Sequence, residues 1–133
     1  KTVRDAEHIQ FEDNLASAET IHRADVLITD RSGIAFEYSF ATERPVLFID
    51  TPLKIRNPRY GALGMEPIEN TLRSKVGIRI TPENVHTVPE VIHELLNQKE
   101  ERSYVIAKLR EAHIFNWLEG ANQAAAYLKN NTK

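Results

Sequence analysis

The sequence contains no cysteine, which excludes disulfide bonds, thiol nucleophiles and cysteine-ligated zinc or iron–sulfur sites. Neither charge dominates, since 17 basic residues face 19 acidic ones, so the chain is not a polycation that binds nucleic acid by charge alone. No apolar run approaches the ~18 residues of a membrane-spanning helix. We therefore expect a globular domain of a reducing compartment, with no nucleic-acid partner and with any membrane association made through other regions.

Short apolar runs separated by a helical pattern predict a parallel sheet. The β-branched run within 25–30 predicts a strand buried on both faces, and 46–50 and 76–80 predict two more strands. Residues 34–42 predict a helix between the first two strands, which makes a βαβ unit. The expected fold is a three-layer, Rossmann-like α/β domain, with a small parallel sheet of three to four strands flanked by helices.

The other predicted elements surround this unit. Phe115 and Trp117 are expected to anchor the core, or else to mark a patch facing another domain. The chain of 133 residues is expected to form a single domain. We predict a short strand, a helix, an irregular segment and three further helices, at Glu7–Phe11, Asn14–Ala24, Leu53–Ser74, Pro89–Asn97, Glu101–Ala112 and Trp117–Lys129.

One segment carries chemistry, because it lies where a strand ends and a helix begins. Ligands of open α/β sheets bind at the carboxyl ends of the strands, and a helix start attracts phosphate. Gly33 allows a close approach of the backbone to an anion, Ser32 adds a hydroxyl donor, and Glu37 is placed to accept two sugar hydroxyls. The predicted nucleotide or phosphate site consists of Asp30, Arg31, Ser32, Gly33, Ile34 and Glu37.

The same residues have a simpler interpretation. Serine is a good helix N-cap, glycine is common in turns, and a glutamate in a first helical turn is stabilised by the helix dipole. A short turn with one glycine is a weak motif. Both interpretations stay open from the spacing alone.

A second group of cations follows the strand at 46–50. Lys54, Arg56 and Arg59 form a possible loop for a phosphate or a polyanionic acceptor, although a solvated surface loop is the more common case. Asp50 is expected to cap the turn after its strand. The five histidines lack the spacing of metal ligands, so we expect no metal and no cofactor.

Two stretches resemble a known family. They read ADVLITDRSGIAFEY at 24–38 and RPVLF at 44–48. They resemble the C-terminal domain of the CDP-glycerol glycerophosphotransferase family, which makes teichoic-acid-type and capsule-type polymers and has the pattern DVLITDYSS…FDY…KPVIFY. More broadly, they are similar to the nucleotide-binding half of GT-B glycosyltransferases and of UDP-N-acetylglucosamine 2-epimerase.

This resemblance implies roles for single residues. Ser32 and Gly33 would hold a pyrophosphate, Glu37 would hold the ribose, and Asp30 would shape the turn. Arg31 replaces the usual tyrosine of the family, and Gly33 replaces the second serine, which is the glycosyltransferase and epimerase version of the turn. The implied ligand is a nucleotide-activated donor, CDP-glycerol or a UDP- or CDP-sugar.

The resemblance also implies a function. The chain would be the donor-nucleotide-binding domain of a transferase that moves glycerol phosphate or a sugar to a cell-surface glycan, in the cytoplasm or at the inner face of the membrane. Nothing here matches the family's upstream catalytic histidines, so the catalytic residues stay unassigned. Because the chain begins at Lys1, we expect a piece of a longer protein that lacks an N-terminal domain. The alternatives are a UDP-N-acetylglucosamine 2-epimerase-like isomerase domain and a non-catalytic α/β interaction or regulatory module.

Overall fold

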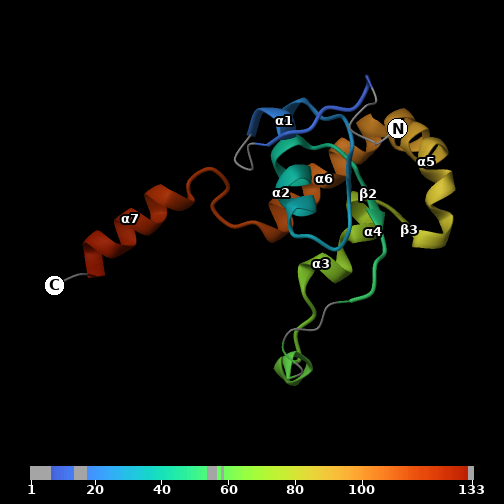
Figure 1. Cartoon of the computed structure of the whole chain (residues 1–133). Coiled ribbons are helices and arrows are strands. Elements are labelled where there is room, and N and C mark those ends of the chain that lie inside the picture. The colour runs from blue at the N-terminus through green and yellow to red at the C-terminus, as the bar shows by residue number, and fades with distance from the viewer. Residues whose placement is uncertain (1–6, 14–17, 54–56, 58, 132–133) are drawn as a thin grey trace.

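The computed structural model describes residues 7–13, 18–53, 57 and 59–131 (Figure 1). Strands and helices alternate through the first two thirds of the chain, and helices complete the rest. In chain order the elements are α1 (Ala18–Arg23), β1 (Leu27–Thr29), α2 (Ile34–Thr42), β2 (Val46–Ile49), η2 (Tyr60–Leu63), α3 (Ile68–Thr71), α4 (Arg73–Val76), β3 (Gly77–Ile80), η3 (Pro82–Thr87), α5 (Val88–Asn97), α6 (Lys99–His113) and α7 (Gly120–Asn131).

The three strands form one parallel sheet in the order β1-β2-β3. In the register of the sheet, Val46 pairs with Leu27 on one side and with Gly77 on the other. Gly77 cannot carry a side chain, because a Cβ there would lie 1.8 Å from the carbonyl oxygen of Val46. The prediction of an α/β fold with a small parallel sheet flanked by helices is confirmed.

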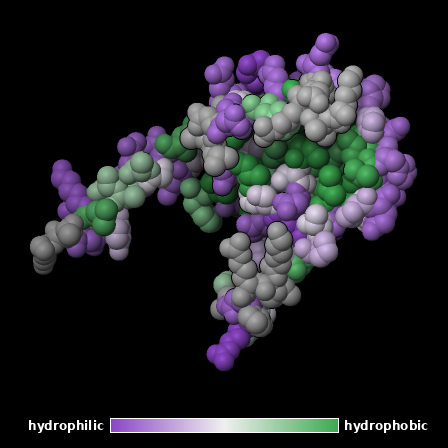
Figure 2. Space-filling model, in the orientation of Figure 1, coloured by the Kyte–Doolittle hydropathy of each residue, from purple (hydrophilic) through white to green (hydrophobic). Residues whose placement is uncertain are grey.

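Helices cover both faces of the sheet, as Figure 1 shows for α5 on one side and for α2 and α6 on the other. Side chains alternate along β2, so Val46 and Phe48 join a core with α2, α4 and α6, whereas Leu47 joins a core with Leu95 of α5. In Figure 2 apolar side chains gather in the middle of the body, and polar ones lie around its rim.

The first strand differs from its prediction. The expectation that it is buried on both faces is wrong, because Ile28 is 44% exposed and Leu27 and Thr29 are only half-buried. In the described sheet β1 is an edge strand. Ile28 pairs with Leu47 and so lies on the face that α5 covers, but α5 packs against β2 and β3. The apolar residues of β1 are therefore not completely buried.

Several local predictions need correction. Residues 7–11 form a turn and an irregular stretch, so the short strand predicted there is wrong. The segment predicted as irregular contains η2, α3 and α4, because Leu72 and Val76 pack into the core and fix its second half. The predicted start of the first helix at Asn14 lies outside the described residues.

The last helix stands away from the body (Figure 1). Every residue of α7 is exposed. Phe115, in the segment before it, is 88% exposed and Trp117 is 39% exposed, so the prediction that both anchor the core is wrong. Within the described part of the chain, no helix has the length and apolar character needed to cross a membrane.

Candidate functional site at the carboxyl edge of the sheet

The turn between β1 and α2 leaves the start of α2 open. Gly33 is the N-cap residue, with φ −61° and ψ −24°, and no side chain caps the helix. The interpretation of Ser32 as the capping residue is therefore wrong. Ser32 and Gly33 are both exposed, and a Cβ placed on Gly33 would have no atom within 4 Å. The N–H groups of Ala35, Phe36 and Glu37 donate to the carbonyl oxygens of Ser32 and Gly33. The open part of this helix start is therefore the exposed turn itself, at the carboxyl edge of the sheet.

The other predicted site residues lie partly around the turn and partly on the surface of α2. Asp30, Arg31 and Ile34 are half-buried around the turn. The Nε of Arg31 donates a hydrogen bond of 2.9 Å to the carbonyl oxygen of Thr51, which ties the turn to the segment after β2. Glu37 is exposed on α2.

A second group of charges lies at this edge around Asp50, directly after β2. The Nη2 of Arg73 in α4 donates a hydrogen bond to Asp50 Oδ1. Arg79 in β3 donates from Nε at 2.9 Å and from Nη2 at 2.5 Å to Asp50 Oδ2. Asp50 therefore pairs with two arginines, and the expectation that it caps the next turn is wrong. We call Arg31, Arg73, Arg79 and Asp50 the arginine cluster.

The arginine cluster is partly desolvated and rich in positive charge. The Arg73 side chain is 3% exposed and its guanidinium lies 4.6 Å from the centre of the Phe48 ring. Its Nε is buried and has no hydrogen-bond partner in the described part of the chain. Two guanidinium groups thus share one carboxylate, the charge of Arg31 acts on Arg73, and hydrogen-bond donors outnumber acceptors.

Burial and ion pairing act together on these groups. Burial alone would raise the pKa of Asp50, but hydrogen bonds from Arg79 and Arg73 outweigh it and lower that pKa below its ordinary value. Burial lowers the pKa of Arg73, Asp50 opposes this change, and the positive charges of Arg31 and Arg79 add to it. The charges of Arg31 and Arg79 therefore both act on Arg73.

An apolar groove of about 380 Å³ lies beside α2, and among the residues that the structure describes Glu37 is the charged one that lines it. The ring of Phe36, which also lines it, lies 6.5 Å from the ring of Phe48, and Phe48 in turn contacts Arg73. The groove is lined by Phe36, Glu37, Phe40, Ile68, Ile114 and Trp117.

The predicted cationic loop is described only in part. Lys54 and Arg56 lie outside the described residues. Arg59 is exposed, and its backbone N–H donates a hydrogen bond of 3.0 Å to Asn57 Oδ1. Among the residues that the structure describes, Arg59 makes no ion pair, which fits the solvated surface loop as well as it fits an anion-binding one.

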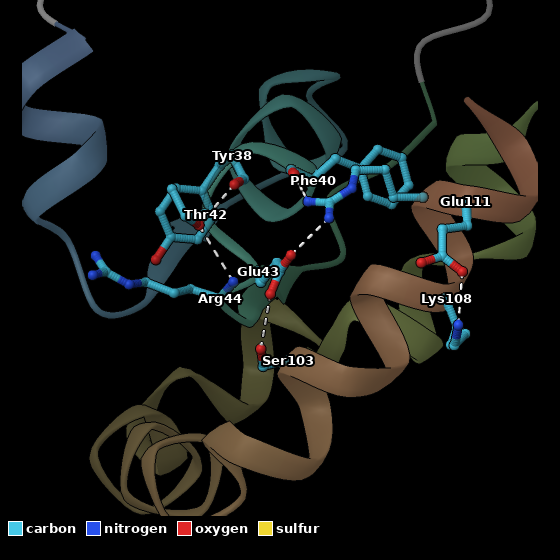
Figure 3. A network of polar contacts seen from close by, with 9 residues as sticks. Tyr38, Phe40, Thr42, Glu43, Arg44, Ser103, Lys108 and Glu111 are labelled. Atoms are coloured by element: carbon cyan, nitrogen blue, oxygen red, sulfur yellow. Dashed lines mark hydrogen bonds and ion pairs between the residues drawn. The ribbon is translucent and has the colours of Figure 1, made fainter. Parts of the chain in front are cut away.

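The opposite end of α2 carries a different polar network (Figure 3). Glu43 ends the helix in the left-handed conformation, with φ 56°. Arg110 of α6 donates hydrogen bonds to Glu43 Oε1 at 2.7 Å and to the carbonyl oxygen of Phe40 at 2.6 Å. Ser103 donates to Glu43 Oε2 at 3.2 Å. This network holds α6 against the end of α2.

Arg73 and Arg79 were missed by the reasoning from sequence. One signal was present, because Arg79 interrupts the otherwise apolar strand Gly77–Ile80. In a strand, alternation places Arg79 on the same face as its partner Phe48, at the carboxyl end. For Arg73 the segment predicted as irregular gave no such signal.

Comparison with known proteins adds no relative: no family model, no curated protein and no solved structure matches the chain.

Proposed function

We propose that the chain binds the diphosphate of a nucleotide-activated donor at the carboxyl edge of its sheet. It would be the donor-binding domain of a transferase that moves glycerol phosphate or a sugar to a cell-surface glycan. The observation that carries the proposal is the open start of α2, which follows β1 directly and exposes Ser32 and Gly33.

The chemistry of this edge suits a phosphate. Unpaired N–H groups at the start of a helix and the positive end of its dipole attract anions. Arg31 adds a fixed positive charge within two residues of Gly33. In a transfer reaction these groups would stabilise the negative charge that develops on the leaving diphosphate, without reorganisation at the moment of reaction.

The finer part of the proposal rests on the resemblance of the turn to the glycerophosphotransferase family and to GT-B enzymes. The donor would be CDP-glycerol or a UDP- or CDP-sugar, and the Glu37 carboxylate would accept hydroxyl groups of its ribose. The catalytic groups would come from another domain, at the cytoplasmic face of the membrane.

Amide NMR titration with CDP, UDP and pyrophosphate tests this proposal. We expect shifts centred on Ser32–Glu37, and we expect Gly33→Asp to weaken CDP binding about tenfold or more, because it places a carboxylate at the anion site. The space around Gly33 is open, so the variant should fold.

Gly120→Asp is the matched control, since Gly120 begins α7 and a Cβ there also meets nothing within 4 Å. It should bind CDP as the wild type does. Equal CDP binding by Gly33→Asp and the wild type would refute the proposal.

A further inference from the structure

We propose that Arg79, with Arg31, takes the second phosphate of the bound diphosphate above the buried positive charge of Arg73, and that Asp50 is the exchangeable counter-ion that holds Arg79 before the ligand arrives. The ligand class rests on the proposed function, whereas the phosphate-binding character of the arginine cluster rests on its own geometry.

The first step is position. Thr29 and Phe48 are partners in the sheet, so the chain leaves β1 and β2 at the same edge and at the same height. Arg31 follows Thr29 by two residues, Asp50 follows Phe48 by two residues, and Arg31 bonds to the carbonyl oxygen of Thr51. The arginine cluster therefore adjoins the turn that begins α2.

The second step is charge. One arginine would suffice to neutralise Asp50, yet two donate hydrogen bonds to it and Arg31 lies close enough to lower the pKa of Arg73. The buried Nε of Arg73 has no acceptor in the described part of the chain. Buried donors are normally paired, so this unpaired donor marks a surplus of donors and of positive charge beneath the exposed Arg79. A phosphate supplies several acceptor oxygens and the missing negative charge.

The third step is exposure, which separates the roles of the arginines. The side chain of Arg73 is 3% exposed, so it is fixed beneath the cluster, whereas that of Arg79 is 44% exposed. An ion pair that is open to solvent on one side contributes little to stability. Arg79 can therefore turn from Asp50 to a phosphate at small cost, while Arg73 keeps Asp50 in place.

The fourth step is specificity. The start of α2 offers a place for one phosphate, and the arginine cluster offers a place for the next. A ligand with two linked phosphates would fill both places, whereas a monophosphate would fill one. The arginine cluster would thus make the domain selective for diphosphates over monophosphates with the same base.

Isothermal titration calorimetry with CDP, CMP and inorganic pyrophosphate, at one low salt concentration, tests the inference. We expect the wild type to bind CDP about tenfold more tightly than CMP, as one charge-assisted hydrogen-bond pair implies. Arg79→Gln should lower the affinity for CDP and pyrophosphate about tenfold and leave that for CMP unchanged. Arg73 is not the variant of choice, because its loss would disturb the core around Phe48.

Arg23→Gln is the control, because Arg23 lies before β1 at the opposite edge of the sheet and its side chain is 78% exposed. It removes the same charge and should leave all three affinities unchanged. If Arg79→Gln and Arg23→Gln bind CDP and pyrophosphate equally, the inference is overturned.

Two further outcomes separate this inference from the proposed function. Binding of pyrophosphate that depends on Arg79, together with CDP binding no tighter than CMP binding, would support the phosphate site and refute its nucleotide ligand. Absence of binding by CDP and by pyrophosphate at millimolar concentration would refute both.

Discussion

The two ends of α2 carry arginine–carboxylate clusters that look alike and are built differently. Beyond the carboxyl end of the helix, Arg110 and Glu43 form one ion pair, and Arg110 also bonds to the carbonyl oxygen of Phe40 and lies 4.9 Å from the centre of the Trp117 ring. Near the start of the helix, Asp50 meets Arg73 and Arg79. In the Glu43 cluster one arginine and Ser103 supply one partner for each carboxylate oxygen. In the Asp50 cluster the arginines offer more donors than the carboxylate can accept.

This difference separates a structural cluster from a binding one. The Glu43 network satisfies a helix end whose last residue adopts a left-handed conformation, and it fixes α6 across that end. The arginine cluster holds more positive charge than the fold needs for the same purpose. If a cluster only stabilises the fold, substitution in it should change the free energy of unfolding, and added anions should have no specific effect. If a cluster binds anions, both substitution and added anions should change that free energy.

The largest effect is expected from Asp50→Asn. It leaves Arg73 buried without its counter-ion, and breaking a buried pair from one side lowers the free energy of unfolding by about 3–5 kcal/mol. Sulfate should restore part of this loss, because an anion that binds only the folded state stabilises it. Urea unfolding with and without sulfate, at constant ionic strength, measures both changes.

Glu43→Gln is the comparison for Asp50→Asn, since it makes the same chemical change at the other end of α2. The Glu43 side chain is 38% exposed, so we expect a loss of about 1 kcal/mol or less and no recovery specific to sulfate. Equal sulfate recovery in the two variants would show a general salt effect and would remove the distinction between the clusters.

A smaller loss is expected from Arg110→Lys. A lysine keeps the charge but cannot bond to Glu43 and to the carbonyl oxygen of Phe40 with one planar fork. The free energy of unfolding should fall by about 1–2 kcal/mol, the scale of one or two lost hydrogen bonds. The affinity for CDP and pyrophosphate should not change, and a drop in either would contradict the structural role of this cluster.

The pH dependence of stability also tests the arginine cluster. The pKa of Asp50 is lowered in the folded state, so its ionised form contributes stability that is complete above the unfolded value near 3.8 and is lost as the pH falls below it. The stability difference between wild type and Asp50→Asn should be constant between about pH 5 and pH 7 and should shrink in stronger acid. An unchanged difference down to about pH 3 would contradict the pairing.

The smallest effect is expected from Glu111→Gln. Glu111 pairs with Lys108 one turn away on α6 at 2.7 Å (Figure 3), and both side chains are more than half exposed. The pair lowers the pKa of Glu111, yet solvent screens such exposed pairs. The melting temperature should stay within experimental error of the wild type. A clear drop would contradict the ranking of these ion pairs by their solvent exposure.

Prediction from sequence worked best where one local pattern decided the structure. The helix at Ile34–Thr42 has the predicted bounds, because Gly33 and Pro45 limit it and an apolar surface favours it. It was wrong for the burial of β1 and for Phe115 and Trp117, because burial depends on which elements pack outside a residue and not on its own apolarity.

The candidate site also contains residues that the sequence could place and residues that it could not. The turn with Ser32 and Gly33 could be placed at the carboxyl edge of the sheet, since a strand followed directly by a helix has only one such arrangement. Arg73 and Arg79 could not be joined to Asp50, because 23 and 29 residues separate them from it. Their meeting depends on the packing of α4 and on the β2–β3 register.

The sequence by itself determined the class of fold, the βαβ unit and the place of the turn before its helix, because these follow from local apolar periodicity and turn residues. Only the tertiary structure decided that β1 is an edge strand, that α7 stands apart and that Arg73 and Arg79 meet at Asp50. Charges distant in the chain become neighbours only when strands pair in one register, and no local pattern carries that information.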